Sequence, residues 1–168
     1  MKEKPLRKSA RFISILLSIG CIIFGIMSVL LFAGIMVFVC AKLFFSEIFL
    51  EAWETAIKAG QTLSSGQCIF FFICVLGEFI CIFLALYNAK RIFGCISKGH
   101  SPFTNTTAIQ IRKIALYVLL FAVFSVLSVF KMVFSSFFMC ALFALILYCI
   151  SLIFDYGCEL QQEIDETL

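Results

Sequence analysis

The segment KGHSPFTNTTAIQIRKIALYV, Lys98 to Val118, is the most polar stretch of an otherwise very apolar chain. It separates two long apolar runs, and basic residues cluster around it. Pro102 disfavours helix at Ser101, because the proline ring clashes with a helical preceding residue, and the chain is expected to break after Gly99. Thr104 is then the predicted helix N-cap, because its hydroxyl can accept a hydrogen bond from a free amide two or three residues on. A helix is expected to begin here and to enter the next apolar run.

The composition places the chain in a membrane. It has 168 residues, of which 63% are hydrophobic and 14% charged, and it contains 22 Phe. Soluble domains are about 45–50% apolar and about 25% charged. A water-soluble fold of this size could not bury so many large apolar side chains. One domain is enough for the length.

Four runs are apolar enough to cross a bilayer, which takes about 20 residues in a helix. The expected spans are residues 12–41, 68–89, 114–133 and 137–154 of a single membrane domain, 1–168. The first run is longer than the apolar core of a cleaved signal peptide, so it is interpreted as an uncleaved anchor. Almost nothing separates the third and fourth spans, which predicts a tight antiparallel hairpin. The expected fold class is all-α, a polytopic transmembrane four-helix bundle.

The orientation follows from the basic residues near the span ends, because cytoplasmic loops carry an excess of Lys and Arg. Ten of the thirteen basic residues lie before the first span or between the second and third. These are Lys2, Lys4, Arg7, Lys8, Arg11, Lys90, Arg91, Lys98, Arg112 and Lys113. Both termini, the loop 90–113 and the acidic tail 155–168 are therefore expected to face the cytoplasm.

The segment IFLEAWETAIKA, residues 48–59, follows the first span and has an amphipathic pattern. This pattern is typical of a short helix lying in the membrane interface. The alternative is that the segment extends the first helix outward.

Each span carries a stripe of small or polar residues at alternating spacings of four and three. In lipid, helices associate through close packing of small residues and interhelical hydrogen bonds, so these stripes are expected to face the bundle interior. They are Ser14, Ser18, Cys21, Gly25 and Ser28; Cys74, Glu78, Cys81, Ala85 and Asn88; Ala122, Ser125 and Ser128; and Ala141, Ala144, Tyr148, Ser151 and Asp155.

Glu78 is the one acidic residue inside the second span, near the expected bilayer midplane. A charge there costs at least about 2.5–3.5 kcal/mol. Glu78 is therefore expected to be protonated or hydrogen-bonded to Ser, Tyr or Asn on a neighbouring helix. It is a candidate intramembrane polar site, either as a packing residue or as a proton relay or substrate site. Cys74 and Cys81 flank it, but no span contains His and no metal site is expected.

The remaining composition carries no enzyme signature. Nine Cys in an odd count without C-x-x-C spacing indicate structural thiols, with a Cys40–Cys68 disulfide as the alternative. The one His, His100, lies in the loop, and no Gly-rich phosphate loop or nucleophile–base pair is evident. We expect no enzymatic activity, no cofactor and no direct nucleic-acid binding.

The C-terminal segment IFDYGCELQQEIDETL has five acidic residues and no basic one. An anionic membrane surface repels such a segment, so it needs another counter-charge. The fourth span is expected to continue as a helix and to pair with the basic loop. The predicted pairs join Glu159 or Glu163 to Lys98, Arg112 or Lys113.

Two motifs resemble a bacterial family of small four-span membrane proteins, domain of unknown function 2975. KGHSPFTNTTAIQIRKIALYV resembles its "G-x-PF-T" turn, and FDYGCELQQEIDETL is similar to its "F-x-x-G-x-x-L-Q-x-E-x-D-x-T" ending. The matching tail residues are Phe154, Gly157, Leu160, Gln161, Glu163, Asp165 and Thr167. The resemblance implies a bacterial cytoplasmic membrane and no established activity. Such proteins are frequently encoded beside a small Cro/CI-like helix-turn-helix regulator, which implies a regulatory pair.

Both motifs fall on the predicted cytoplasmic face, which makes them a candidate docking surface. Its residues are Pro102, Phe103, Thr104, Arg112, Lys113, Phe154, Gly157, Glu159, Leu160, Gln161, Glu163, Asp165 and Thr167. The first hypothesis is a non-enzymatic regulatory or docking component of the bilayer that binds a cytoplasmic partner, such as a small transcriptional regulator. The alternatives are a small transporter, channel-like or immunity protein that uses the bundle interior around Glu78, and a structural subunit of a larger complex. Self-association into a homo-oligomer is left open.

Overall fold

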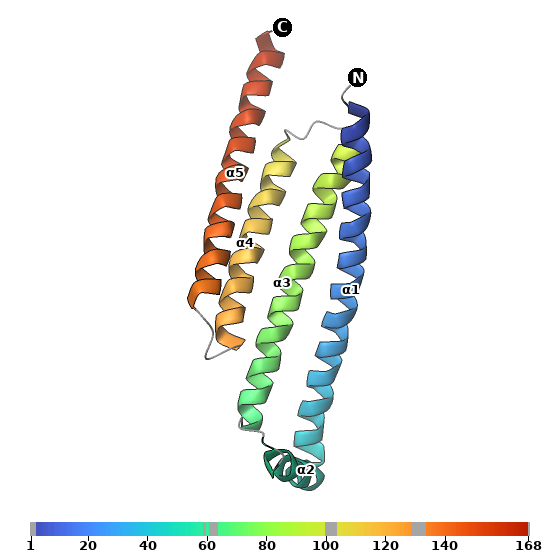
Figure 1. Ribbon diagram of the computed structural model, residues 1–168, viewed down its shortest axis with the longest axis vertical. Coiled ribbons are helices and arrows are strands. Elements are labelled where there is room, and N and C mark those ends of the chain that lie inside the picture. Colours follow the sequence, from blue (N-terminus) through green and yellow to red (C-terminus); the bar gives the residue numbers. More distant parts are fainter. Residues whose placement is uncertain (1–2, 59, 61–63, 100–103, 129–133, 168) are drawn as a thin grey trace.

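The protein is an array of five α-helices, as the computed structural model shows (Figure 1). Residues 3–58, 60, 64–99, 104–128 and 134–167 are described, and within them the side chains of 3–7, 134–136, 161 and 164–167 are not. The helices are α1 (Glu3–Phe44), α2 (Ser46–Lys58), α3 (Ser65–Ser97), α4 (Asn105–Ser128) and α5 (Phe134–Thr167).

Four of these helices are long and apolar enough to cross a membrane. Their qualifying stretches are Lys8–Phe44, Ser65–Ser97, Asn105–Ser128 and Phe137–Leu160. The shorter stretches have 24 residues, or roughly 36 Å of helix, against about 30 Å of hydrocarbon. The expectation of an all-α, four-span membrane protein is confirmed.

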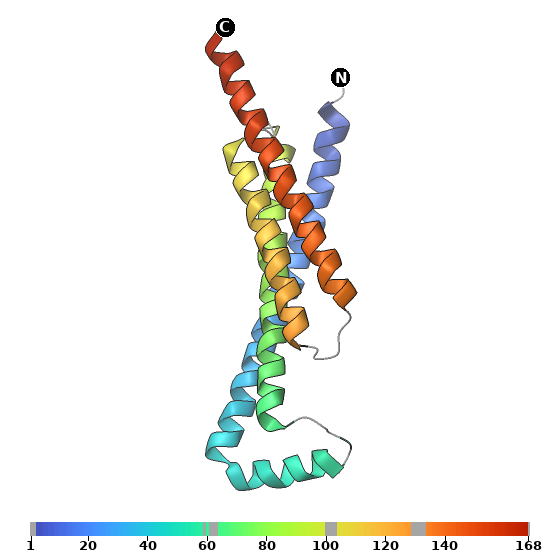
Figure 2. The same ribbon diagram turned by 90° about the vertical axis from the view of Figure 1, so that its left-hand side faces the viewer.

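The spans pack side by side in the order in which they occur along the chain. Helix α1 packs on α3, α3 on α4, and α4 on α5, while α1 and α5 share no extensive contact within the described residues. Figure 1 shows α1 and α5 at opposite ends of this row, and Figure 2 looks along the row from the α5 side. Helices α4 and α5 form the predicted antiparallel hairpin. The start of α1, the end of α3, the start of α4 and the end of α5 lie at one end of the bundle, and α2 lies at the other (Figure 1).

The connection between the second and third spans is shorter than the loop 90–113 expected from the sequence. Helix α3 runs on to Ser97, and Gly99 ends it with a φ of 85°, a left-handed conformation that glycine adopts without strain. Helix α4 begins at Asn105. Thr104 caps it as predicted, because its Oγ1 accepts a hydrogen bond from the Thr107 amide at 3.3 Å.

Helix α2 lies across the end of the bundle, so it does not extend α1 outward (Figure 2). Its rings fold back on the first span, since Phe49 and Trp53 lie 5.3 and 6.1 Å from the Phe38 ring, centroid to centroid. Three acidic residues and Lys58 share the opposite face of the helix. This separation of apolar and charged faces confirms the predicted amphipathic helix and is typical of one that lies in the membrane interface.

The stripes of small residues form the contacts between the spans, as predicted. Buried members come from all four helices: Cys21, Cys74, Cys81, Asn88, Ala122, Ala144 and Ser151. The large apolar side chains are mostly exposed, and Phe12, Val29 and Val37 are 68–69% exposed. Because lipid tails are as apolar as these side chains, close approach of small residues decides which faces meet.

Two spans approach each other closely at Gly77 on α3. A Cβ atom at this position would lie 2.9 Å from three atoms of the Phe124 ring on α4, which is closer than real contacts allow. At Gly34 on α1, a Cβ atom would meet nothing within 4 Å. The α3–α4 contact therefore requires glycine, and the exposed position on α1 does not.

We expect Gly77→Val to destabilise the protein by about 1–3 kcal/mol, because overpacking forces the two helices apart. Gly34→Val changes the helix propensity in the same way and is expected to leave stability almost unchanged. Unfolding titrations of both variants in mixed micelles measure the difference. Equal stabilities would contradict the contact, and adding Phe124→Leu to Gly77→Val should recover part of the loss.

Candidate functional site

The candidate docking surface comes from the first half of α4 and the last third of α5, at the same end of the bundle. Thr104, Arg112 and Lys113 belong to the start of α4 and its cap, and Phe154, Gly157, Glu159, Leu160 and Glu163 belong to α5. Gln161, Asp165 and Thr167 lie on the α5 helix, although their side chains are outside the described part. Pro102 and Phe103 lie outside the described residues. The predicted continuation of the fourth span as a helix is confirmed.

An ion pair joins the two parts of this surface. The Arg112 guanidinium donates to Asp155 Oδ2 at 2.5 Å, and the Arg112 and Asp155 side chains are 46% and 33% exposed. The same guanidinium lies 5.7 Å from the centre of the Tyr148 ring, in position for a cation–π contact. Arg112 therefore ties the start of α4 to α5 through two kinds of contact.

The sequence predicts Glu159 as one of the possible partners of Arg112. The observed partner, Asp155, lies one helical turn before Glu159 on α5. Asp155 is the first acidic residue after the fourth apolar run. Glu159 is exposed and lies roughly 6 Å further along the helix. One feature of the sequence indicated that Asp155 faces a neighbouring helix, namely its place in the stripe of small and polar residues on α5. That stripe also contains Tyr148, so it marked both groups that hold Arg112.

Helix α5 projects beyond its neighbour α4 (Figure 1). Past Asp155, α5 continues for roughly 18 Å to Thr167. This stretch carries exposed Glu159 and Glu163 together with Leu160, which is 41% exposed. The result is an acidic helix that stands clear of the rest of the protein.

Glu78 takes part in a hydrogen bond between two spans. Ser128 Oγ on α4 donates to Glu78 Oε1 on α3 at 2.6 Å. This bond confirms the prediction of a Ser, Tyr or Asn partner on a neighbouring helix. Ser128 Oγ also lies 3.1 Å from the Ser125 carbonyl oxygen. A protonated Glu78 can therefore donate to Ser128, which then donates to this carbonyl. Either protonation state of Glu78 leaves the hydroxyl bonded.

The surroundings of Glu78 consist of packed side chains. Cys74 and Cys81, one turn away on either side, are buried free thiols. Lateral grooves open between α1 and α3, between α3 and α4 and between α4 and α5, and Glu78 is not among the residues that line them. No disulfide joins Cys40 to Cys68, so the alternative of a bond between them is not realised.

These features define the class of the molecule, which is a small multi-pass membrane protein with four helical spans and an interfacial helix. No family model, curated protein or solved structure matches the chain. The family resemblance carried by the loop and tail motifs therefore gains no support from the comparisons, and the class depends on the four apolar helices.

We expect a double-mutant cycle on Arg112 and Asp155 to show favourable coupling. Asp155→Asn alone should lower the free energy of unfolding by less than about 1 kcal/mol, because the pair is partly exposed. The exchanged pair Arg112→Asp with Asp155→Arg should recover part of that loss. Lys113→Gln is the control, since Lys113 makes no ion pair within the described residues. Zero coupling in micelle unfolding titrations would contradict the pair.

Proposed function

We propose that this protein is a non-enzymatic docking component of the membrane that binds a cytoplasmic protein through the start of α4 and the projecting end of α5. One observation carries the proposal: α5 continues as an acidic helix past the end of α4. A segment needed only to span the bilayer would end near Asp155. The additional three turns present charged and apolar side chains to the aqueous phase.

The cytoplasmic placement of this end belongs to the same proposal. Seven basic residues with described side chains lie at the end of the bundle that holds both termini. They are Lys8, Arg11, Lys90, Arg91, Lys98, Arg112 and Lys113. An excess of Lys and Arg near the span ends is typical of the cytoplasmic side.

The chemistry of the projecting helix defines the partner. Its acidic side chains favour a basic surface, and the anionic leaflet beneath does not compete for them because it carries the same charge. Tyr156 is 62% exposed and lies one helical turn from Leu160, so an apolar stripe runs beside the acidic face. A basic protein with an apolar groove fits both features. The family resemblance suggests a small helix-turn-helix regulator as that protein.

The bundle interior supports transport less well than the helix end supports docking. Glu78 ties α3 to α4 through Ser128, and the nearby Gly77–Phe124 contact is closed to even one added methyl group. We therefore assign Glu78 an interhelical packing role and place the function at the end of the bundle.

The proposal predicts that charge reversal on the projecting helix removes a soluble partner. Tagged full-length protein is purified from its native membrane, and the co-purified proteins are quantified by mass spectrometry. Glu159→Lys with Glu163→Lys should lose the partner, as should truncation after Gly157, which keeps Asp155 in place. Both tail changes are expected to reduce recovery of the partner at least tenfold.

The matched control is Glu47→Lys with Glu51→Lys, which makes the same charge change on exposed residues of α2 at the other end of the bundle. This variant should retain the partner. A green fluorescent protein fused after Leu168 reports the sidedness, because it matures in the cytoplasm. Equal recovery from the α2 and α5 variants, or a non-fluorescent fusion, would overturn the proposal.

A further inference from the structure

We infer that the groove between α1 and α3 binds one anionic phospholipid, with an acyl chain along the groove and the headgroup phosphate at Lys90. The groove has a volume of about 560 Å³ and opens sideways toward the surrounding membrane. It is polar at one end and apolar along the rest of its length. This site is separate from the proposed docking surface on α4 and α5.

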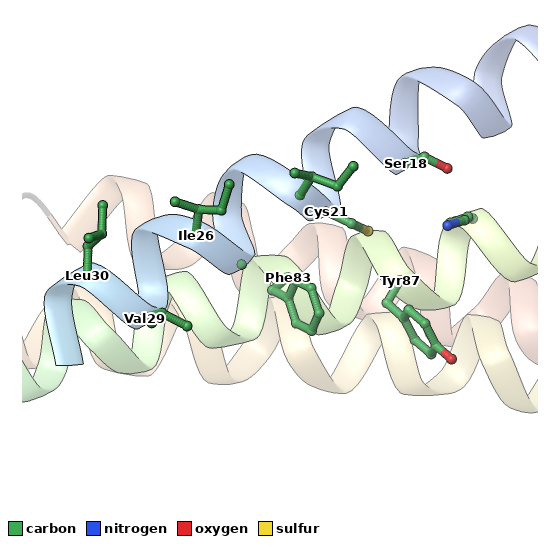
Figure 3. A pocket seen from close by; sticks show the side chains of 10 residues that line it. Ser18, Cys21, Ile26, Val29, Leu30, Phe83 and Tyr87 are labelled. Carbon is green, nitrogen blue, oxygen red and sulfur yellow. The ribbon is translucent and has the colours of Figure 1, made fainter. Parts of the chain in front are cut away.

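The apolar part of the groove follows the small-residue contact of the two helices. Cys21 and Gly25 form its floor on α1. The rings of Phe83 and Tyr87 form a wall on α3 (Figure 3). These two rings are stacked, with centroids 6.4 Å apart and planes at 22°. A Cβ atom on Gly25 would lie 3.4 Å from the Phe83 ring. Because glycine has no side chain, the space between Gly25 and this ring stays open.

The length of the groove suits one leaflet of a bilayer. Its lining on α1 runs from Ser18 to Leu30, which is roughly 18 Å of helix. Half of the hydrocarbon core is about 15 Å thick. An acyl chain that enters at Ser18 would therefore end near the bilayer centre at Leu30.

The polar end of the groove carries a positive charge at headgroup depth. Lys90 is the first basic residue after the second apolar run, and Ser18 lies beside it across the α1–α3 contact. Lys90 is half-buried and has no ion-pair partner within the described residues, and none of the ten described lining residues is acidic. Basic pockets between spans on the cytoplasmic side are typical sites for anionic headgroups.

The groove between α4 and α5 is similar in size, with a volume of about 600 Å³, and also has cations at its polar end. There, Asp155 neutralises Arg112, whereas Lys113 keeps its charge on an exposed side chain. In the α1–α3 groove the uncompensated cation, Lys90, is half-buried beside the apolar channel, and this charge complementarity selects an anionic lipid over a zwitterionic one.

Native mass spectrometry of the full-length protein tests the inference. The protein is released from micelles that contain equal amounts of phosphatidylglycerol and phosphatidylcholine with the same palmitoyl and oleoyl chains. We expect one retained phosphatidylglycerol per chain. Lys90→Gln should lower the preference for phosphatidylglycerol about fivefold, the effect of one cation near an anionic surface, and Lys90→Arg should preserve it.

Arg91→Gln is the matched control, because Arg91 is the exposed neighbour of Lys90 and does not line the groove. It should leave the preference unchanged. Gly25→Leu should fill the floor and reduce retention of both lipids. If Lys90→Gln and Arg91→Gln lowered the preference for phosphatidylglycerol equally, the preference would come from diffuse surface charge. That result would overturn the inference. Equal retention of the two lipids by the unmodified chain would overturn it as well.

Discussion

The structure depends on one constraint, which is that the hydrocarbon core offers no water to backbone or side-chain polar groups. Each span satisfies its backbone as a helix, and several of the serine hydroxyls donate to carbonyl oxygens one turn back. Ser18 and Ser28, for example, donate to the carbonyl oxygens of Ser14 and Phe24 at 2.9 and 2.7 Å. Because lipid tails are as apolar as the side chains, exclusion of water does not decide which apolar faces of the helices meet. The helices meet where small residues let them approach closely.

The row of spans follows from where those small residues lie. Helix α3 has small residues for both of its neighbours: its Gly77 faces α4, and a Cβ atom on its Gly94 would lie 4.0 Å from Ser14 Oγ on α1. Within the described residues, α1 and α5 each pack extensively on one other span and leave wide apolar faces for lipid. The grooves between neighbouring helices therefore open to the membrane, while the projecting end of α5 is available to an aqueous partner. Lipid contact and protein docking are assigned to separate parts of one small chain.

The sequence predicted the features that depend on composition and local chemistry. The four spans, the Thr104 cap, the hairpin, the buried stripes and the serine partner of Glu78 all follow from apolar runs, helix capping and the cost of a buried charge. It did not predict that α1 and α5 lie at opposite ends of a row, because lipid-facing and helix-facing surfaces are both apolar. It also missed Asp155 as the partner of Arg112, since the register of α4 against α5 depends on how their small residues interlock.

The central claim is that, within the described residues, each span packs extensively only on its neighbours along the chain, and site-specific photo-crosslinking tests it most directly. Benzoylphenylalanine is placed at Phe83, which faces α1, and at Phe143, which is 54% exposed on α5. After illumination in membranes, mass spectrometry identifies the linked peptides. The account predicts that the Phe83 probe links to α1 near Gly25 and that the Phe143 probe forms no link to α1. A link from Phe143 to α1 within one chain would close the bundle and contradict the row.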